Sequence, residues 1–251
     1  MIKFNKNDYR ASKIDVINKI KETHDWQKTE GFIADGIICP EIYEIQKLKI
    51  LCILGESYGY DECKMVDIED QLKDNIIGVG DPKRQTSTKI PALLWLILKS
   101  HALGRKISWA DFPKLLISNK SNLNELQDTI SKIAWVNVKK ASRHITNWGN
   151  DATRQNENDI YNNAIRNRDI LKIQIDSIAP DLMIVCSNPV FNGLYDSDLL
   201  GNGIERNKKY QLQTNILGQK VIQVNHPSYY RDWGYEGIYK LYEIIYGGIR
   251  V

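Results

Sequence analysis

The chain has 251 residues, of which 42% are hydrophobic and 26% are charged. This length allows one α/β domain with a substantial core, and the composition is ordinary for a soluble globular protein. Lys and Arg number 34 against 31 Asp and Glu, which gives a formal net charge of +3. That balance is too even to identify a nucleic-acid partner by itself, although it allows a local basic face.

Membrane insertion, secretion and metal binding find little support in the sequence. No apolar run approaches the ~20 residues of a membrane-spanning helix. The first ten residues lack the apolar centre of a signal peptide, so we expect a cytoplasmic protein. Cys39, Cys52, Cys63 and Cys186 form no C-x-x-C pair, so we expect reduced thiols, no metal and no cofactor. Cys52 and Cys186 are expected on buried strands.

Hydrophobic spacing predicts helices and strands that alternate along the chain. In chain order, we expect a helix over 11–23, a strand over 48–54, a helix over 90–104, a strand over 133–138, a helix over 158–179, strands over 181–187 and 220–225, and a helix over 235–246 with Gly247 and Gly248 past its end. This order predicts a single three-layer α/β domain over 1–251, with a central four-stranded parallel sheet flanked by helices. Residues 1–47 are expected to form an N-terminal helical extension.

Polar residues follow the predicted strands. The first strand leads into a Gly-Glu-Ser-Tyr-Gly turn at 55–59, and the second ends at Asn137. The third is followed by Ser187 and Asn188, and the fourth by His226. Because ligands bind at the carboxyl ends of parallel strands, we expect these groups to share one crevice.

Each of these residues also has an ordinary structural explanation. Gly55 and Gly59 suit a tight turn, and Glu56 suits a helix N-terminus. Asn137 is able to satisfy a backbone group at a strand end, and His226 to make a single loop contact. Their joint occurrence at successive strand ends favours a functional site.

The motifs at these strand ends resemble those of the uracil-DNA glycosylase superfamily. They are the GESYG turn at 55–59, Asn137 within WVNVKK, and the H-P-S element that begins at His226. The resemblance covers residues 48–246 through order and spacing. It implies a DNA glycosylase that flips a damaged or modified base out of DNA and hydrolyses its N-glycosidic bond. We expect DNA as the partner, a monomer, and a role in base-excision repair or anti-phage defence.

The resemblance also implies catalytic and base-binding roles. Asn137 matches the family's base-pairing Asn, and its amide offers a donor and an acceptor. His226 matches the histidine whose N–H stabilises the departing base. Glu56 or Ser57 falls where the family positions its water, and Glu56 is favoured because a serine hydroxyl is a poor base near neutral pH.

Aromatic and basic residues near the strand ends suit contacts with DNA. Tyr229, Tyr230 and Arg231 follow the H-P-S element, where a wedge enters the duplex. Phosphate contacts, which position a protein without reading sequence, are expected from Ser228, Lys139, Lys140, Arg143, Lys83 and Arg84. The Lys and Arg pairs equally suit a solvated face.

The chain departs from the family in its stacking residue. Uracil-excising members usually place an aromatic between the first motif and the Asn, whereas residues 74–94 contain none. Tyr58 or Tyr60 is the expected substitute, although Tyr58 stands where the family usually has Pro. Alternatively, the pocket is wider and accepts a base larger than uracil. Because the stacking aromatic is missing, we hypothesise an altered pyrimidine, rather than plain uracil, as the substrate.

Two other functions remain open from the sequence. GESYG also matches the G-x-S-x-G turn of α/β hydrolases, with Ser57 as nucleophile and His226 as base. Its place after the first strand, and the lack of a preceding H-G-G-G-type loop, count against that interpretation. The other alternative is a non-catalytic DNA-binding homologue, in which Ser57 accounts for lost chemistry.

Overall fold

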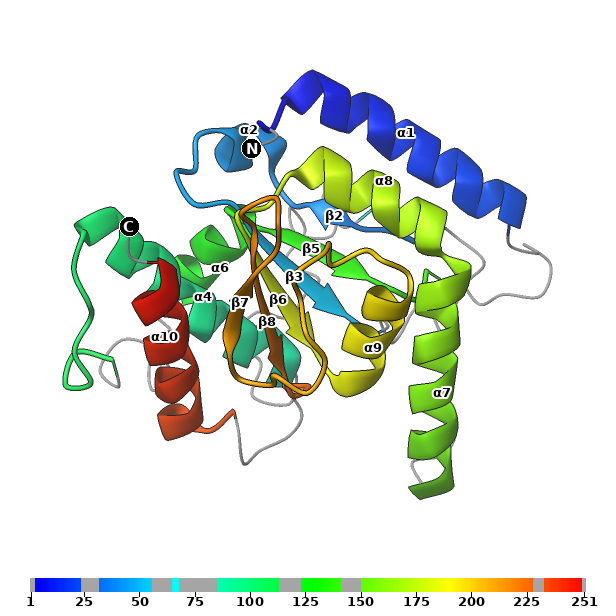
Figure 1. The fold of residues 1–251 in the computed structure, drawn as a ribbon. Helices are drawn as coiled ribbons and strands as arrows, with labels where there is room; N and C mark the ends of the chain where they lie inside the picture. The colour runs from blue at the N-terminus through cyan, green and yellow to red at the C-terminus, as the bar shows by residue number, and fades with distance from the viewer. Residues whose placement is uncertain are drawn as a thin grey trace.

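The computed structural model describes residues 3–23, 32–55, 65–67, 85–112, 123–140, 150–227 and 233–249 (Figure 1). The strands in these ranges are β1 (Phe32–Ala34), β2 (Gly36–Ile37), β3 (Ile50–Leu54), β4 (Met65–Asp67), β5 (Ala134–Asn137), β6 (Leu182–Cys186), β7 (Leu212–Thr214) and β8 (Lys220–Val224). The helices are α1 (Lys6–Thr23), α2 (Pro40–Glu44), α4 (Gln85–Leu103), α6 (Leu123–Ser131), α7 (Asn150–Arg166), α8 (Arg168–Ile178), α9 (Asn188–Asp196) and α10 (Tyr235–Ile249).

The main sheet has six strands in the order β2-β5-β3-β6-β8-β7. Strands β5, β3, β6 and β8 are mutually parallel, whereas β2 and β7 pair antiparallel at the two edges. The predicted α/β class is therefore confirmed, but the sheet is mixed and six-stranded rather than four-stranded and parallel. Both added strands are only two or three residues long, too short to produce a recognisable apolar run.

The central strand β3 is buried on both faces. Ile50, Cys52 and Leu54 pack into one hydrophobic cluster, and Leu51 and Ile53 pack into the other. Successive side chains of a strand point to opposite faces, so a strand between two helical layers needs a continuous apolar run. This explains why the sequence ILCIL forms the middle of the sheet.

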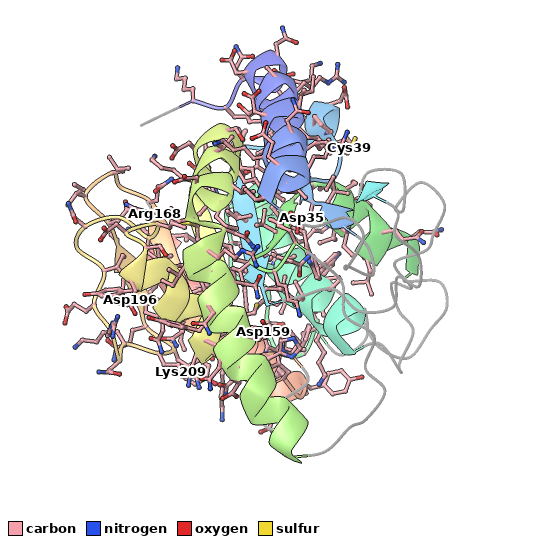
Figure 2. The ribbon with its side chains drawn as sticks, turned by 90° about the vertical axis from the view of Figure 1, so that its right-hand side faces the viewer. Asp35, Cys39, Asp159, Arg168, Asp196 and Lys209 are labelled. Carbon is pink, nitrogen blue, oxygen red and sulfur yellow. The ribbon has the colours of Figure 1, made fainter. Side chains whose placement is uncertain are left out.

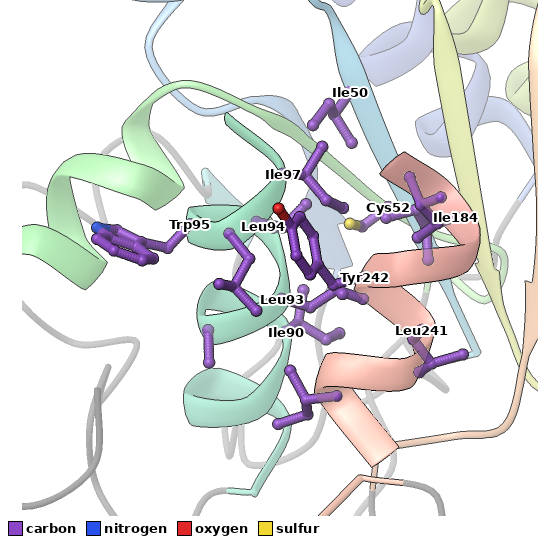
Figure 3. Packing of buried hydrophobic residues seen from close by; sticks show 14 of the residues in the cluster. Ile50, Cys52, Ile90, Leu93, Leu94, Trp95, Ile97, Ile184, Leu241 and Tyr242 are labelled. Atoms are coloured by element: carbon purple, nitrogen blue, oxygen red, sulfur yellow. The ribbon is translucent and has the colours of Figure 1, made fainter. Parts of the chain in front are cut away.

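Helices cover both faces of the sheet (Figure 1). Helices α4, α6 and α10 contribute to the first cluster, in which Leu93 and Tyr242 pack near Cys52 (Figure 3). Helices α7, α8 and α9 contribute to the second cluster. Helix α1 lies outside α8, where Val16 and Ile20 pack with Ile170. No helix within the described ranges is both long and apolar enough to pass through a membrane.

The predicted helix over 158–179 is two helices. Helix α7 begins at Asn150 and ends at Arg166, and α8 follows after Asn167. The Asn167 side chain is buried and its Nδ2 donates to the backbone oxygen of Val138 at 2.9 Å. A tertiary contact therefore accompanies the helix break, and the apolar spacing of this segment does not reveal it.

The first 47 residues contain both helices and strands. Helices α1 and α2 fall in this segment, and β2 pairs with β5 at the edge of the main sheet. Strand β1 instead pairs in parallel with β4. The segment therefore supplies part of the sheet itself.

Gly193 marks the close approach of α9 to α7. A Cβ at this position would lie 2.4 Å from the Ala164 Cβ and 3.1 Å from the Tyr161 backbone oxygen. We predict that Gly193→Ala lowers the free energy of unfolding by about 1–3 kcal/mol, because the helices must separate. Chemical denaturation measures this change.

Gly247 on α10 provides the matched control for this prediction. A Cβ there meets nothing within 4 Å. Gly247→Ala should therefore raise the free energy of unfolding by about 0.5–1 kcal/mol through its effect on helix propensity. Equal stabilisation by both substitutions would contradict the close contact between α7 and α9.

Candidate functional site at the carboxyl edge of the sheet

The parallel strands end together at one edge of the sheet. Leu54 lies opposite Asn137 in the β3–β5 register, and the Lys139 backbone N–H donates to the Gly55 oxygen at 3.0 Å. Across the sheet, the Ser187 backbone N–H donates to the Val224 oxygen at 2.8 Å. The ends of β5, β3, β6 and β8 thus form a continuous edge, with His226 two residues beyond β8.

Four of the predicted site residues fall in the described part of the chain: Asn137, Lys139, Lys140 and His226. The remaining predicted residues lie outside the described ranges, and their roles stay predictions. They are Glu56, Ser57, Tyr58, Tyr60, Lys83, Arg84, Arg143, Ser228, Tyr229, Tyr230 and Arg231.

Asn137 lies at the end of β5 and is 1% exposed. Its Nδ2 donates to Asp35 Oδ2 at 3.0 Å, and its backbone N–H donates to the same oxygen at 2.5 Å. A carboxylate accepts hydrogen bonds but donates none, so the amide nitrogen of Asn137 must face Asp35. The orientation of this side chain is therefore fixed by a residue of the N-terminal segment.

Lys140 is fully buried beside the same carboxylate. Its Nζ lies 2.7 Å from Asp35 Oδ1, and both side chains are 0% exposed. Burial lowers the pKa of Lys140, and the adjacent Asp35 carboxylate partly offsets that effect. A phosphate contact by Lys140 does not fit this position, because the ammonium group is inside the protein and already paired. We therefore correct that prediction.

Gln174 of α8 completes the surroundings of Asp35. Its Nε2 donates to Asp35 Oδ1 at 3.0 Å and to the Asp35 backbone oxygen at 2.9 Å. Its Oε1 is buried and has no hydrogen-bond partner among the described residues. Asp35 therefore lies beside α8, and its side chain is fully buried (Figure 2 labels Asp35).

Lys139 points toward α7. Its side chain is 10% exposed, and its Nζ lies 2.8 Å from Asp159 Oδ2. Asn163 Nδ2 donates to the other oxygen of Asp159 at 3.0 Å, which fixes the carboxylate (Figure 2 labels Asp159). A DNA phosphate would have to compete with Asp159 for this lysine.

His226 lies in a cationic and partly buried environment. Lys89 of α4 donates from Nζ to the Pro227 backbone oxygen at 2.9 Å. Burial, followed by the charge of Lys89, lowers the pKa of His226 to about 4. The imidazole is therefore neutral near pH 7, with one ring N–H donor and one acceptor nitrogen.

Ser187 adopts an unusual backbone conformation after β6. Its φ of 101° and ψ of 154° lie in a region that is essentially restricted to glycine. Its Oγ is buried and has no hydrogen-bond partner within the described ranges. The next residue, Asn188, accepts a 3.0 Å hydrogen bond from Gln223 Nε2 through Oδ1. This strand-to-helix turn thus places a constrained hydroxyl at the candidate edge.

Sequence reasoning missed Asp35, Gln174 and Lys89. Asp35 interrupts the apolar stretch FIADGI, and an isolated carboxylate between apolar residues is a recognisable signal for a buried pair. Lys89 directly precedes the buried part of α4. Neither signal identifies a partner, because the contacts are made by residues far away along the chain.

The described cysteines are free thiols. Cys52 and Cys186 are buried on β3 and β6, as predicted. Burial raises the pKa of both, that of Cys186 to about 12. These thiols are therefore protonated and unreactive near neutral pH. Within the described part of the chain, no three His, Cys, Asp or Glu side chains are grouped to hold a metal ion.

Comparison with known proteins identifies no family for this chain. No protein-family model matches it. A search of curated proteins likewise finds no significant match. Functional inference therefore depends on the site and on the motifs.

We predict that the environment of His226 keeps its imidazole neutral down to about pH 5. NMR titration of the His226 ring protons should give a pKa well below the ordinary 6.5. Lys89→Met should raise that pKa partway, because it removes the positive charge but leaves the burial. Lys99→Met, on an exposed site of the same helix, is the control and should leave it unchanged.

The same shift makes stability depend on pH. Because the folded-state pKa of His226 lies below its unfolded value, protonation favours the unfolded chain. The free energy of unfolding should therefore fall as pH decreases from about 6.5 to about 4, and His226→Gln should weaken that dependence. A normal titration near pH 6.5 would contradict the described environment.

Proposed function

We propose that the protein is a DNA glycosylase whose active site lies at the carboxyl edge of the sheet. The observation that supports this most is the environment of His226, whose pKa is lowered to about 4. A neutral imidazole held at a strand end, on the same edge as Asn137, is suited to donate an N–H to a departing base. The family motifs at 55–59, 137 and 226 support the same function.

The reaction requires stabilisation of negative charge on the base. When the N-glycosidic bond breaks, the bonding electrons leave with the base and the sugar gains oxocarbenium character. A neutral His226 carries one ring N–H. This N–H is able to donate a hydrogen bond to the developing anion, with no change in the protonation state of the imidazole. The nearby ammonium of Lys89 adds a favourable charge, since its field already lowers the pKa of His226. Water then attacks the sugar carbon, and Glu56 is the proposed residue that positions it. The proton that the water loses ends on the base anion, so the products are the neutral free base and an abasic sugar that carries a hydroxyl group.

Asn137 is proposed to read the edge of the flipped base. Its burial fits the floor of a pocket that excludes water, where a mismatched hydrogen bond is costly. Flipping the base out of the stack costs a few kcal/mol. A fixed amide compensates part of that cost with hydrogen bonds that need no further ordering of the protein.

The proposed substrate is an altered pyrimidine. The chain lacks the aromatic that usually stacks on uracil, and Tyr58 or Tyr60 is proposed to take that role. DNA is the proposed partner, either damaged host DNA in base-excision repair or modified phage DNA in defence. Both settings require the same chemistry at the edge of the sheet.

The test is excision from labelled oligonucleotides, measured as strand cleavage after alkali treatment. The panel carries uracil, 5-hydroxymethyluracil, 5-hydroxymethylcytosine, its glucosylated form and oxidised bases. We predict excision of at least one base, reduced about 100-fold or more in His226→Ala, since an equivalent donor contributes that much elsewhere. Asn137→Ala should show a comparable loss.

His101→Ala provides a matched control, because His101 lies in the last turn of α4, away from the strand ends. It should retain full activity. Cleavage of no oligonucleotide, with DNA binding intact, would support the non-catalytic alternative. Absence of both cleavage and binding would overturn the proposal, and ester hydrolysis abolished by Ser57→Ala would establish a hydrolase instead.

A further inference from the structure

We infer that Asp35 is a positioning residue that sets which base edge Asn137 recognises. This inference rests on the proposed glycosylase function. Asp35 itself contacts no base; it acts through the orientation of the Asn137 amide. Residues of the N-terminal segment would thereby determine the specificity of a site at the end of β5.

The contacts leave one orientation for the Asn137 amide. Asp35 Oδ2 accepts from both the backbone N–H and Nδ2 of Asn137, at 2.5 and 3.0 Å. A flipped amide would place Oδ1 against this carboxylate oxygen, and two acceptors would then face each other without a proton. Inside the protein, where water does not screen the charges, that arrangement is strongly unfavourable.

Asp35 is itself held in place by other contacts. Its second oxygen, Oδ1, lies 2.7 Å from Lys140 Nζ and accepts from Gln174 Nε2 at 3.0 Å. The neighbouring Gly36 lies opposite Trp135 in the β2–β5 register, which fixes the backbone beside β5. Lys140 and Gln174 Nε2 offer only donors to Oδ1, and Asn137 offers two donors to Oδ2, so both carboxylate oxygens of Asp35 are engaged as acceptors.

This orientation determines the hydrogen-bond pattern offered to a base. With Nδ2 turned to Asp35, the amide has Oδ1 and the second N–H of Nδ2 left to offer to a base. Oδ1 requires a donor on the base, such as the ring N–H of a 2,4-dioxopyrimidine. A cytosine-type base carries an acceptor nitrogen at that ring position. The proposed specificity is therefore for uracil-type edges, including those with a substituent on the opposite side of the ring.

The test compares excision of uracil-type and cytosine-type bases that carry the same 5-hydroxymethyl group. The variant is Asp35→Ala combined with Lys140→Met. The first substitution removes the acceptor that holds Nδ2 of Asn137, so the Asn137 amide is able to take either orientation. The second substitution removes the buried ammonium, which would otherwise lose its partner at a cost of about 3–5 kcal/mol in comparable buried pairs.

We expect wild-type protein to prefer the uracil-type base, and the double variant to lower the ratio of the two kcat/KM values about 10-fold or more. Lys140→Met alone is the control: it lowers stability but keeps Asp35, so the ratio should be unchanged. If both activities of the double variant fall equally, Asp35 has only a structural role and the inference is wrong. If wild-type protein excises neither base nor any other, the proposed function itself has failed.

A second measurement does not depend on the variant folding. The side-chain N–H₂ protons of Asn137 should exchange slowly with solvent in wild-type protein, because Nδ2 is buried and bonded to Asp35. NMR detects this exchange directly. Rapid exchange of both protons would show that Asp35 does not hold the amide, and would overturn the inference even if excision is observed.

Discussion

The buried ion pair between Asp35 and Lys140 is the interaction on which the candidate site depends. Both side chains are fully buried, so each has lost its hydration. The attraction between two such charges does not by itself compensate for that loss, and further hydrogen bonds are needed. Asn137 and Gln174 supply them to the carboxylate. The burial of the Asp35 charge and the position of the Asn137 side chain at the end of β5 therefore depend on the same set of contacts.

This interaction gives the two-residue strand β2 a structural role at the edge of the sheet. Strand β2 offers little apolar area, but it carries the chain past Asp35 and into register with β5.

At the other side of the site, Lys89 of α4 holds the Pro227 carbonyl next to His226. The two predicted functional side chains are thus each positioned by a charged residue from a distant element. In the proposed glycosylase, this arrangement would fix the base edge and the leaving-group donor before DNA binds, so that little reorganisation is needed during the reaction.

The parts of the fold that the sequence predicts are those with a local cause. Continuous apolar runs identify β3 and β6, because a strand covered on both faces is almost entirely apolar, and β8 is identified by a shorter run that Gln223 interrupts. Alternation with helices then places Asn137 and His226 on a common edge.

The features that could not be predicted depend on contacts between residues far apart in the chain. Asp35 meets Asn137 across 102 residues of chain and Lys140 across 105, and no local pattern connects them. The sequence KK indicates surface charge, whereas Lys140 is buried because a carboxylate from the N-terminal segment pairs with it.

The most direct test of the central claim is hydrogen exchange with a DNA duplex that contains a tetrahydrofuran abasic site. This duplex imitates the product of base excision and cannot be cleaved as a substrate. We predict slower exchange at the carboxyl edge of the sheet, in residues 54–55, 137–140 and 225–227. The opposite edge, where Lys49, Asp181 and Lys220 join the starts of three strands, should be unchanged. Protection at that opposite edge, or no protection at all, would contradict a DNA-processing site at the strand ends.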